Sequence, residues 1–270
     1  MEYQMLVLDL DGTLTNSKKE LTEPTRKALI EIQEAGRKVV LASGRPINGV
    51  KPLADKLNLA KYGGYMLSFN GARITHCTTG ANVYNKTLPQ EVIRPIFDIA
   101  KAYPGVDLIT YDDTRIFSGL KPNRYTEIES SINSMEIIPV DDFASHITFP
   151  INKLLIPGEP EVLEKIMDVL NKRFHKFLNI YRSEPFFLEI MPQNIDKAHS
   201  LHRLLNSIGL TADSMICCGD GYNDLSMIEF AGLGVAMENA QPVVKETADF
   251  ITKSNDDEGI LHVINLFMRD

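Results

Sequence analysis

The chain has 270 residues, 44% of them apolar and 24% charged, which is typical of a folded globular protein with one large domain or two modest ones. The formal net charge is -8 and no run of lysine and arginine is present, so the composition argues against a nucleic-acid-binding surface. No apolar stretch reaches the length of a membrane span and the N-terminus lacks a signal-peptide pattern, so we expect no membrane partner and a cytoplasmic location.

The first predicted element is a strand over residues 5–8, an apolar run that is followed by two carboxylates, Asp9 and Asp11. An uninterrupted apolar run is typical of a central parallel strand, and open α/β sheets bind ligands at the carboxyl ends of such strands. The spacing of the two carboxylates lets both face one crevice, and Gly12 lets the backbone turn there. The alternative is a hairpin at the Asp-Gly pair, but a hairpin predicts a second strand where residues 16–20 are polar.

A helix over residues 22–36 and a second buried strand over residues 38–43 follow. Strand, helix and strand in this order predict a right-handed parallel unit. The second strand ends at Ser43, Gly44 and Arg45, which are therefore expected beside the end of the first strand. Three further elements complete this part of the chain, namely a weak helix over residues 46–59, a strand over residues 65–69 and a short hairpin return over residues 72–74.

From about residue 82 the regular alternation stops, which predicts an α+β domain inserted into the α/β one. Two strands of this domain are expected to pair around Tyr111, Asp112 and Asp113; these could contact a sugar, but a solvated hairpin tip is favoured. The predicted boundaries are residues 1–82 and 191–270 for the core and 83–190 for the inserted domain. Its expected elements are helices over residues 88–103 and 160–174, and strands over residues 107–111, 115–118, 152–156, 177–182 and 186–191.

The alternation of helix and strand resumes after the inserted domain. A helix over residues 195–208 carries Lys197, which alone would be a solvated helix residue, and a strand over residues 215–218 precedes Asp220. Two of the three cysteines lie in that strand and are expected in the core; the odd number predicts no disulfide framework and a reducing compartment. Together the elements predict a doubly wound, mostly parallel α/β sheet. Its last elements are strands over residues 233–237 and 250–252 and helices from residues 240 and 258.

Several carboxylates meet at the predicted sheet edge, where they would repel one another and raise one another's pKa. A hard divalent cation removes this repulsion, and Mg²⁺ binds through one or two carboxylates together with water and phosphate oxygens. Asp9 and Asp220 are the expected direct ligands, with the backbone carbonyl oxygen of Asp11 as a third. Asp224 is expected to hold a metal-bound water or Lys197, or only to cap its own helix.

The same edge collects hydrogen-bond donors that suit a transferring phosphoryl group. One carboxylate oxygen of Asp9 could attack phosphorus to form an aspartyl-phosphate. Asp11 could then protonate the leaving oxygen and later deprotonate the attacking water. The expected phosphate donors are the N–H groups of Leu10 and Gly44, the Ser43 hydroxyl, the Asn223 amide and the Lys197 ammonium.

Four ordered segments resemble the motifs of the haloacid dehalogenase-like (HAD) superfamily, most closely its Cof-type sugar-phosphatase branch. They are Asp9-Leu10-Asp11-Gly12-Thr13, Ser43-Gly44-Arg45, Lys197 and Gly219-Asp220-Gly221-Tyr222-Asn223-Asp224. The resemblance covers essentially the whole chain and implies a Rossmann-like core, with a cap between the second and third motifs. It implies Asp9 as nucleophile, Asp11 as general acid/base, and Mg²⁺ held by Asp9, Asp220 and the Asp11 carbonyl. It also implies phosphate contacts from Ser43, Lys197 and Asn223, with supporting places for Asp224, Thr13 and Arg45.

Some of these residues have simpler explanations. Ser43-Gly44 and Asp220-Gly221 could each be a plain turn. Arg45 could contact substrate or only pair with a carboxylate, and the sequence does not separate the two roles. His199 and His202 have the spacing of a metal-ligand pair, but no third ligand accompanies them, so surface histidines are favoured.

We therefore expect a Mg²⁺-dependent phosphatase that hydrolyses small phosphorylated metabolites, sugar phosphates above all, and that acts as a monomer or small homo-oligomer. Three alternatives stay open. A phosphomutase of the same superfamily would use the same aspartyl-phosphate but return the phosphoryl group to a sugar. A dehalogenase would need the carboxylate nucleophile but no metal, and a regulatory module would bind a sugar phosphate without turnover.

Overall fold

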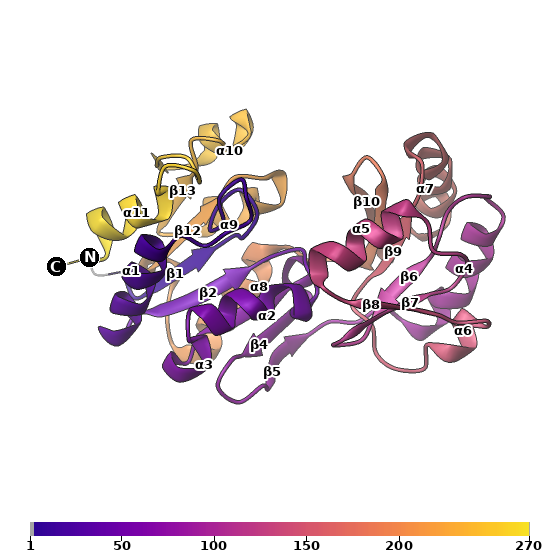
Figure 1. The fold of residues 1–270 in the computed structure, drawn as a ribbon, viewed down its shortest axis with the longest axis horizontal. Coiled ribbons are helices and arrows are strands. Elements are labelled where there is room, and N and C mark those ends of the chain that lie inside the picture. The colour runs from indigo at the N-terminus through magenta and orange to yellow at the C-terminus, as the bar shows by residue number, and fades with distance from the viewer. Residues whose placement is uncertain (1–2, 270) are drawn as a thin grey trace. The chain divides into compact units, whose positions relative to one another are not determined.

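The computed structural model describes residues 3–269, which separate into two compact units (Figure 1). The first unit combines two stretches of the chain, one that ends at Tyr84 and one that begins at Asp196. The second unit is Asn85–Ile195, so it interrupts the first unit in sequence. Each unit has its own sheet and its own buried apolar cluster.

The first unit contains one eight-stranded sheet. Its strands are β1 (Met5–Leu8), β2 (Lys38–Ala42), β3 (Tyr65–Ser68), β4 (Arg73–His76), β5 (Asn82–Asn85), β12 (Met215–Gly219), β13 (Leu233–Ala236) and β14 (Phe250–Ile251). They lie in the order β14-β13-β12-β1-β2-β3-β4-β5, and every pair from β14 to β3 is parallel. β4, which returns from β3 as the predicted hairpin, is antiparallel to β3. The edge strand β5 was not predicted.

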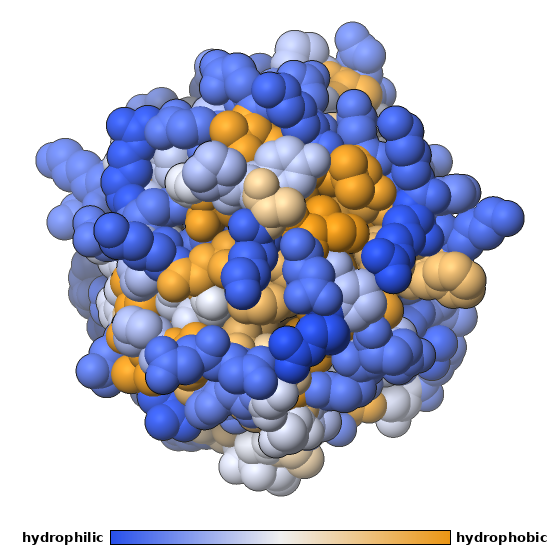
Figure 2. Space-filling view, turned by 90° about the vertical axis from the view of Figure 1, so that its right-hand side faces the viewer, coloured by the Kyte–Doolittle hydropathy of each residue, from blue (hydrophilic) through white to orange (hydrophobic). Residues whose placement is uncertain are grey.

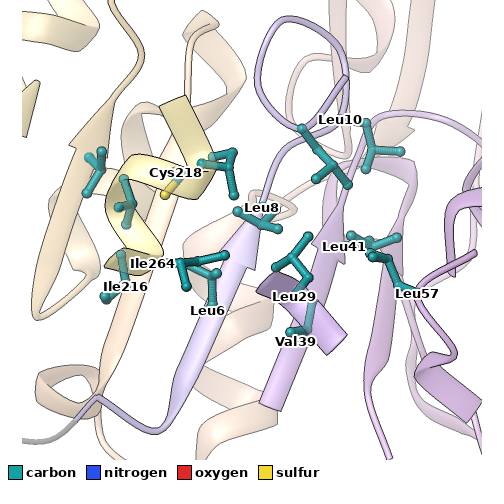
Figure 3. Close-up of a cluster of buried hydrophobic side chains, with 14 of the residues drawn as sticks. Leu6, Leu8, Leu10, Leu29, Val39, Leu41, Leu57, Ile216, Cys218 and Ile264 are labelled. Carbon is teal, nitrogen blue, oxygen red and sulfur yellow. The ribbon is translucent and has the colours of Figure 1, made fainter. Parts of the chain in front are cut away.

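Helices cover both faces of this sheet (Figure 1). They are α1 (Glu23–Glu34), α2 (Ile47–Lys56), α3 (Leu59–Tyr62), α8 (Lys197–Ile208), α9 (Leu225–Phe230), α10 (Pro242–Thr247) and α11 (Gly259–Phe267). Side chains of β1 point alternately to the two faces of the sheet. Leu6 and Leu8 pack with α1 and α11 on one face (Figure 3), whereas Met5 and Val7 pack with α8 on the other. The uninterrupted apolar run of β1 therefore serves two buried faces.

The doubly wound, mostly parallel fold that the sequence predicts is confirmed for this unit. Cys217 and Cys218 are completely buried in β12 with free thiols, as expected for core residues. No helix within residues 3–269 is long and apolar enough to cross a membrane. On the face of the molecule in Figure 2, hydrophilic residues surround smaller apolar areas, which is ordinary for a folded protein.

The second unit contains a six-stranded mixed sheet in the order β10-β11-β9-β6-β7-β8. The strands are β6 (Ile109–Tyr111), β7 (Arg115–Ser118), β8 (Glu136–Pro139), β9 (Leu154–Pro157), β10 (Leu178–Glu184) and β11 (Phe187–Pro192). The helices are α4 (Ile93–Lys101), α5 (Arg124–Asn133), α6 (Phe143–His146) and α7 (Pro160–Phe174). Residues of α4, α6 and α7 form one apolar cluster with one face of the sheet.

Two expectations for the second unit are wrong. No element was expected over residues 119–151, where α5, β8 and α6 lie. α5 is largely polar, and its capping box joins Asn123 to Thr126, without the glutamate or glutamine that marks such a helix start in a sequence. The expectation that Tyr111 lies at a solvated hairpin tip is also wrong. Its side chain is 5% exposed, and its hydroxyl donates to Glu129 Oε1 of α5 at 2.7 Å. Asp112 binds Arg115 through its carboxylate, and only Asp113 is an exposed tip residue.

Candidate active site

Three predicted site residues directly follow neighbouring parallel strands. Asp9 follows β1, Ser43 follows β2 and Asp220 follows β12, and β1 lies between the other two. Parallel strands end at the same edge of a sheet, so the topology brings these side chains to one edge. The polar strand ends that the sequence analysis singled out are therefore neighbours in space.

Lys197, the first residue of α8, lies at the centre of this edge. Its side chain is completely buried, and its Nζ donates to Asp9 Oδ1 at 2.7 Å, to Asp224 Oδ1 at 2.6 Å and to the Ala42 carbonyl oxygen at 2.8 Å. All three ammonium protons are thereby used. Burial alone would lower the pKa of Lys197, but the charges of Asp224 and Asp9 raise it above its ordinary value. The solvated-helix explanation of this lysine does not hold.

Of the roles that the sequence left as alternatives for Asp224, the structure shows the contact with Lys197, whereas its side chain does not cap the helix α9 that follows it. One carboxylate oxygen, Oδ1, accepts from Lys197, as expected of a residue that positions this lysine. The other, Oδ2, accepts the backbone N–H groups of Asp220 at 3.0 Å and Gly221 at 2.9 Å. The second contact caps the short 3₁₀ turn Tyr222–Asp224. Asp224 therefore ties the loop that carries Asp220 to the buried lysine.

The site holds more buried negative charge than positive charge. Asp9, Asp220 and Asp224 each offer an oxygen that lies within 4.8 Å of the others. Burial, and then the charge of Asp224, raise the pKa of Asp9 to about 8 and that of Asp220 to about 6, although Lys197 opposes both shifts. Within residues 3–269, neither Asp9 Oδ2 nor Asp220 Oδ2 accepts a hydrogen bond. Hard carboxylate oxygens with an uncompensated charge fit a divalent cation such as Mg²⁺.

The turn after Asp11 lies directly against Asp220. Gly12 has a φ of +83°, and a Cβ built on it would lie 2.4 Å from Asp220 Oδ2, so both the conformation and the close approach require glycine. Thr13 donates its hydroxyl to Asp220 Oδ1 at 3.0 Å. The next element after this turn is the helix α1 and not a second strand, so the hairpin alternative for the Asp-Gly pair is wrong.

Asp11 points its carboxylate to a different set of partners. Arg45 grips it with two hydrogen bonds, Nε to Oδ2 at 2.8 Å and Nη2 to Oδ1 at 2.6 Å, and Lys19 Nζ lies 2.7 Å from Oδ1. Burial alone would raise the pKa of Asp11, but the hydrogen bonds and charge of Arg45, followed by those of Lys19, lower it below its ordinary value. Of the two roles left open for Arg45, the structure shows the pairing with a carboxylate. Contact of Arg45 with substrate stays a prediction.

The expected phosphate donors border the same sheet edge. Ser43 is buried, and its hydroxyl oxygen accepts the Arg45 N–H at 3.2 Å. Within the described residues, the N–H groups of Leu10 and Gly44 donate to no other residue and so can serve an anion. Asn223 donates Nδ2 to the side-chain oxygen of Asn70 at 3.1 Å.

Asn70 is the residue of this region that sequence reasoning missed. Its signal was available, because Asn70 comes after β3, as Asp9, Ser43 and Asp220 come after their strands. The histidines that resemble a ligand pair have separate partners: His199 accepts from Arg203 Nε, and His202 contacts Asn206.

Comparison with known proteins shows the family. Residues 6–264 match the family model described as haloacid dehalogenase-like hydrolase, which is nearly the whole chain. The chain belongs to this family. A solved structure of a haloacid dehalogenase-like hydrolase from Bacteroides thetaiotaomicron superposes with a TM-score of 0.95 at 45% identity, covering 98% of this chain and 99% of that one. The resemblance to the Cof-type branch of the HAD superfamily is thereby confirmed.

Two relatives from Bacillus subtilis (strain 168) carry names for an activity. The putative phosphatase YxeH is 33% identical over 269 residues, covering 97% of each chain. The 5-amino-6-(5-phospho-D-ribitylamino)uracil phosphatase YcsE is 30% identical over 264 residues, covering 98% of this chain and 95% of the relative. The prediction of a phosphatase enzyme from this HAD family is confirmed by these comparisons.

Proposed function

We propose that this HAD-family phosphatase is Mg²⁺-dependent and hydrolyses small phosphorylated metabolites, sugar phosphates among them, through an aspartyl-phosphate on Asp9. The observation that carries the proposal is the environment of the Asp9 carboxylate. One of its oxygens is fixed by the buried Lys197, and the other accepts no hydrogen bond within the described chain. A nucleophile needs such an arrangement, with one oxygen held in place and one available to attack.

The carboxylates of Asp9 and Asp220 and the backbone carbonyl of Asp11 are the groups that would hold Mg²⁺. Asp224 is excluded from direct contact in this proposal, because both of its oxygens already accept N–H groups. When bound, the cation would supply positive charge that favours ionised Asp9 and Asp220 and that neutralises the phosphoryl oxygens. Lys197 would remain the fixed positive charge that orients Asp9.

The reaction consists of two displacements at phosphorus. Asp9 Oδ2 forms a bond to phosphorus while the bond to the ester oxygen breaks, and that oxygen takes a proton from Asp11. A water molecule then attacks phosphorus, gives its proton back to Asp11 and releases phosphate and the free Asp9 carboxylate. Asp11 has to leave Arg45 and Lys19 before it can carry a proton, since both cations stabilise its ionised form.

The substrate class is inferred from the proposed site residues, which would contact the phosphoryl group and not the alcohol to which it is attached. Its donors are backbone N–H groups, a hydroxyl and an amide, beside the positive charge of Lys197, and these serve an anion rather than a particular alcohol. The relative YcsE is named for a substrate with a phosphate on a ribityl chain. We infer that this protein accepts small phosphate monoesters of sugar-like alcohols, and the role of the second unit as a cap that selects among them stays a prediction.

A panel of small phosphate monoesters, assayed with Mg²⁺ and with EDTA, tests the proposal. We expect release of inorganic phosphate with Mg²⁺ and its loss with EDTA. Transfer of the phosphoryl group from a hexose 1-phosphate to its 6-position would instead identify a mutase. Halide release that survives EDTA would identify a dehalogenase, and tight binding of a sugar phosphate without turnover would identify a regulatory module.

A further inference from the structure

The turn after β3 has a strained backbone. Phe69 and Asn70 have φ values of 52° and 51°, and Gly71 follows with a φ of 102°, so three successive residues lie in the left-handed region. A bulky residue such as phenylalanine is rarely found there, because its side chain makes this backbone conformation unfavourable. Strain of this kind persists only where contacts with the surrounding structure hold the backbone in place.

The contacts of this turn join two parts of the site. Phe69 donates its N–H to the Arg45 carbonyl oxygen at 3.0 Å, and Asn70 donates its N–H to the Ser43 carbonyl oxygen at 2.9 Å. On the other side, the Gly71 carbonyl oxygen accepts the hydroxyl of Ser200 in α8 at 2.7 Å. The turn is therefore fixed between the loop after β2 and the helix that begins with the buried lysine.

The Asn70 side chain lies between two proposed phosphate donors. Its Oδ1 accepts Asn223 Nδ2 at 3.1 Å, and a Cβ built on Gly44 would lie 3.1 Å from the same oxygen. The Asn70 side chain is nearly buried, at 9% exposure. An asparagine amide carries two N–H donors, so the one that Asn223 gives to Asn70 leaves a second for a ligand.

We propose that Asn70 is a positioning residue of the phosphate site, which orients the Asn223 amide so that its second N–H faces the phosphoryl group. This inference rests on the proposed function, because it takes Asn223 to be a phosphate ligand. The strained turn places the Asn70 oxygen where Asn223 needs an acceptor, and without it the Asn223 amide would be free to rotate. Asn70 acts through Asn223 and not on the reacting atoms.

Asn70→Gly tests this role without disturbing the backbone, because glycine adopts a positive φ at no steric cost. We expect the KM for a phosphate monoester and the Ki of inorganic phosphate to rise about tenfold, with a smaller change in kcat, since a charge-assisted contact is weakened. The matched control is Asn58→Gly, an exposed asparagine with a φ of 54° at the start of α3, which should leave KM unchanged.

A double-mutant cycle separates positioning from a merely structural effect. Asn70→Gly in an Asn223→Ala background should change KM less than twofold, because the group through which Asn70 acts is gone. A full tenfold effect in that background, or a single Asn70→Gly variant with a normal KM, would overturn the inference. If Asn70→Gly does not fold, Asn70→Ala removes the same acceptor oxygen; its KM should also rise about tenfold, and an unchanged KM overturns the inference.

The wild-type assay distinguishes failure of this inference from failure of the proposed function. Wild-type protein that releases phosphate with normal kinetics upholds the function, and the Asn70 variants then decide the positioning role alone. Wild-type protein that releases no phosphate from any ester overturns both proposals together.

Discussion

Asp9 and Asp11 lie two residues apart on one turn, yet their surroundings differ in almost every respect. Asp9 is buried against other carboxylates and one fully buried lysine, and its pKa is raised to about 8, by burial first and then by the charge of Asp224. The Asp11 side chain is 37% exposed and is held by two cations, Arg45 and Lys19, which lower its pKa. The surroundings therefore shift the pKa values of two aspartates in opposite directions.

This difference shows what each carboxylate still needs before it can react. A nucleophile must be ionised, and Asp9 in its present surroundings favours the protonated form, so it needs the charge of a cation. A general acid must carry a proton, and Asp11 favours the ionised form, so it needs to part from Arg45. Pairs of carboxyl groups with separated pKa values are typical of acid–base sites, and here the separation also predicts which ligand or movement each one requires.

The largest expected effect is on turnover when each carboxylate is neutralised. Asp9→Asn should reduce kcat more than about ten-thousand-fold, because the amide cannot form the acyl phosphate. Asp11→Asn should reduce it by about a hundred- to ten-thousand-fold, and less with a p-nitrophenyl ester, whose leaving group needs no proton. Steady-state assays of the two variants measure the difference. Equal losses with both kinds of ester would contradict the separate roles.

The second expected effect concerns the cation that each carboxylate contacts. Lys197→Met should lower the free energy of unfolding by about 3–5 kcal/mol, because two buried carboxylates lose their partner. Arg45→Met should lower it by only about 1 kcal/mol, since its pair with Asp11 is partly exposed. Denaturant titration measures both changes. Mg²⁺ should stabilise both variants by binding to the native state, and the lysine variant more, because there it also offsets two carboxylates that have lost their partner. No such larger rescue would argue against a cation site beside Asp9.

The third expected effect concerns the turn that follows Asp11. Gly12→Ala would place a methyl group 2.4 Å from Asp220 Oδ2, and we expect the affinity for Mg²⁺ to fall about tenfold as that carboxylate moves. Gly36→Ala is the matched control, because Gly36 also has a positive φ, 92°, but nothing lies within 4 Å of its added Cβ. Both variants should lose a similar amount of stability from the left-handed backbone. Equal Mg²⁺ affinity in the two would contradict Asp220 as a ligand.

The smallest expected effect is a release of protons when Mg²⁺ binds. At about pH 7 Asp9, with its pKa of about 8, holds most of a proton, which a metal ligand must give up. Calorimetry in buffers of different ionisation enthalpy should therefore detect release near neutral pH that disappears above about pH 9. Asp11→Asn should release as many protons as the wild type, because Asp11 is already ionised and offers only its backbone carbonyl. Binding heats that are the same in every buffer at pH 7 would show that Asp9 is not protonated there.

Much of the first unit could be predicted from the sequence, because its central strands β1, β2 and β12 end in recognisable polar groups. Apolar runs followed by Asp9, Ser43 and Asp220 indicate buried parallel strands, and parallel order alone places those residues on one edge. Lys197 could be linked to them only through a family resemblance, since a single lysine at a helix start carries no signal of burial. The partner of Arg45 was left open, because the pairing depends on how the loop after Gly12 turns.

The second unit was harder to predict for a physical reason. Helix α5 is polar over most of its surface, so apolar periodicity, the main signal of a helix, is weak there. Once α5 was missed, Tyr111 had no reason to be buried, and a turn tip was the natural expectation. Asn70 was missed for another reason, because an Asn-Gly pair after a strand is an ordinary turn signal. Its place after β3 was the available signal, and its backbone strain and its contact with Asn223 distinguish it from an ordinary turn residue.

Trapping a covalent phospho-enzyme shows whether Asp9 is the nucleophile. Protein turning over a good phosphate ester with Mg²⁺ is quenched, treated with borohydride, which reduces acyl phosphates to alcohols, and mapped by peptide mass spectrometry. The account predicts homoserine in place of Asp9, lost when EDTA is present and increased in Asp11→Asn, whose second displacement is slowed. Active wild-type protein with Asp9 unmodified, or with the reduced residue at another carboxylate, would contradict the account.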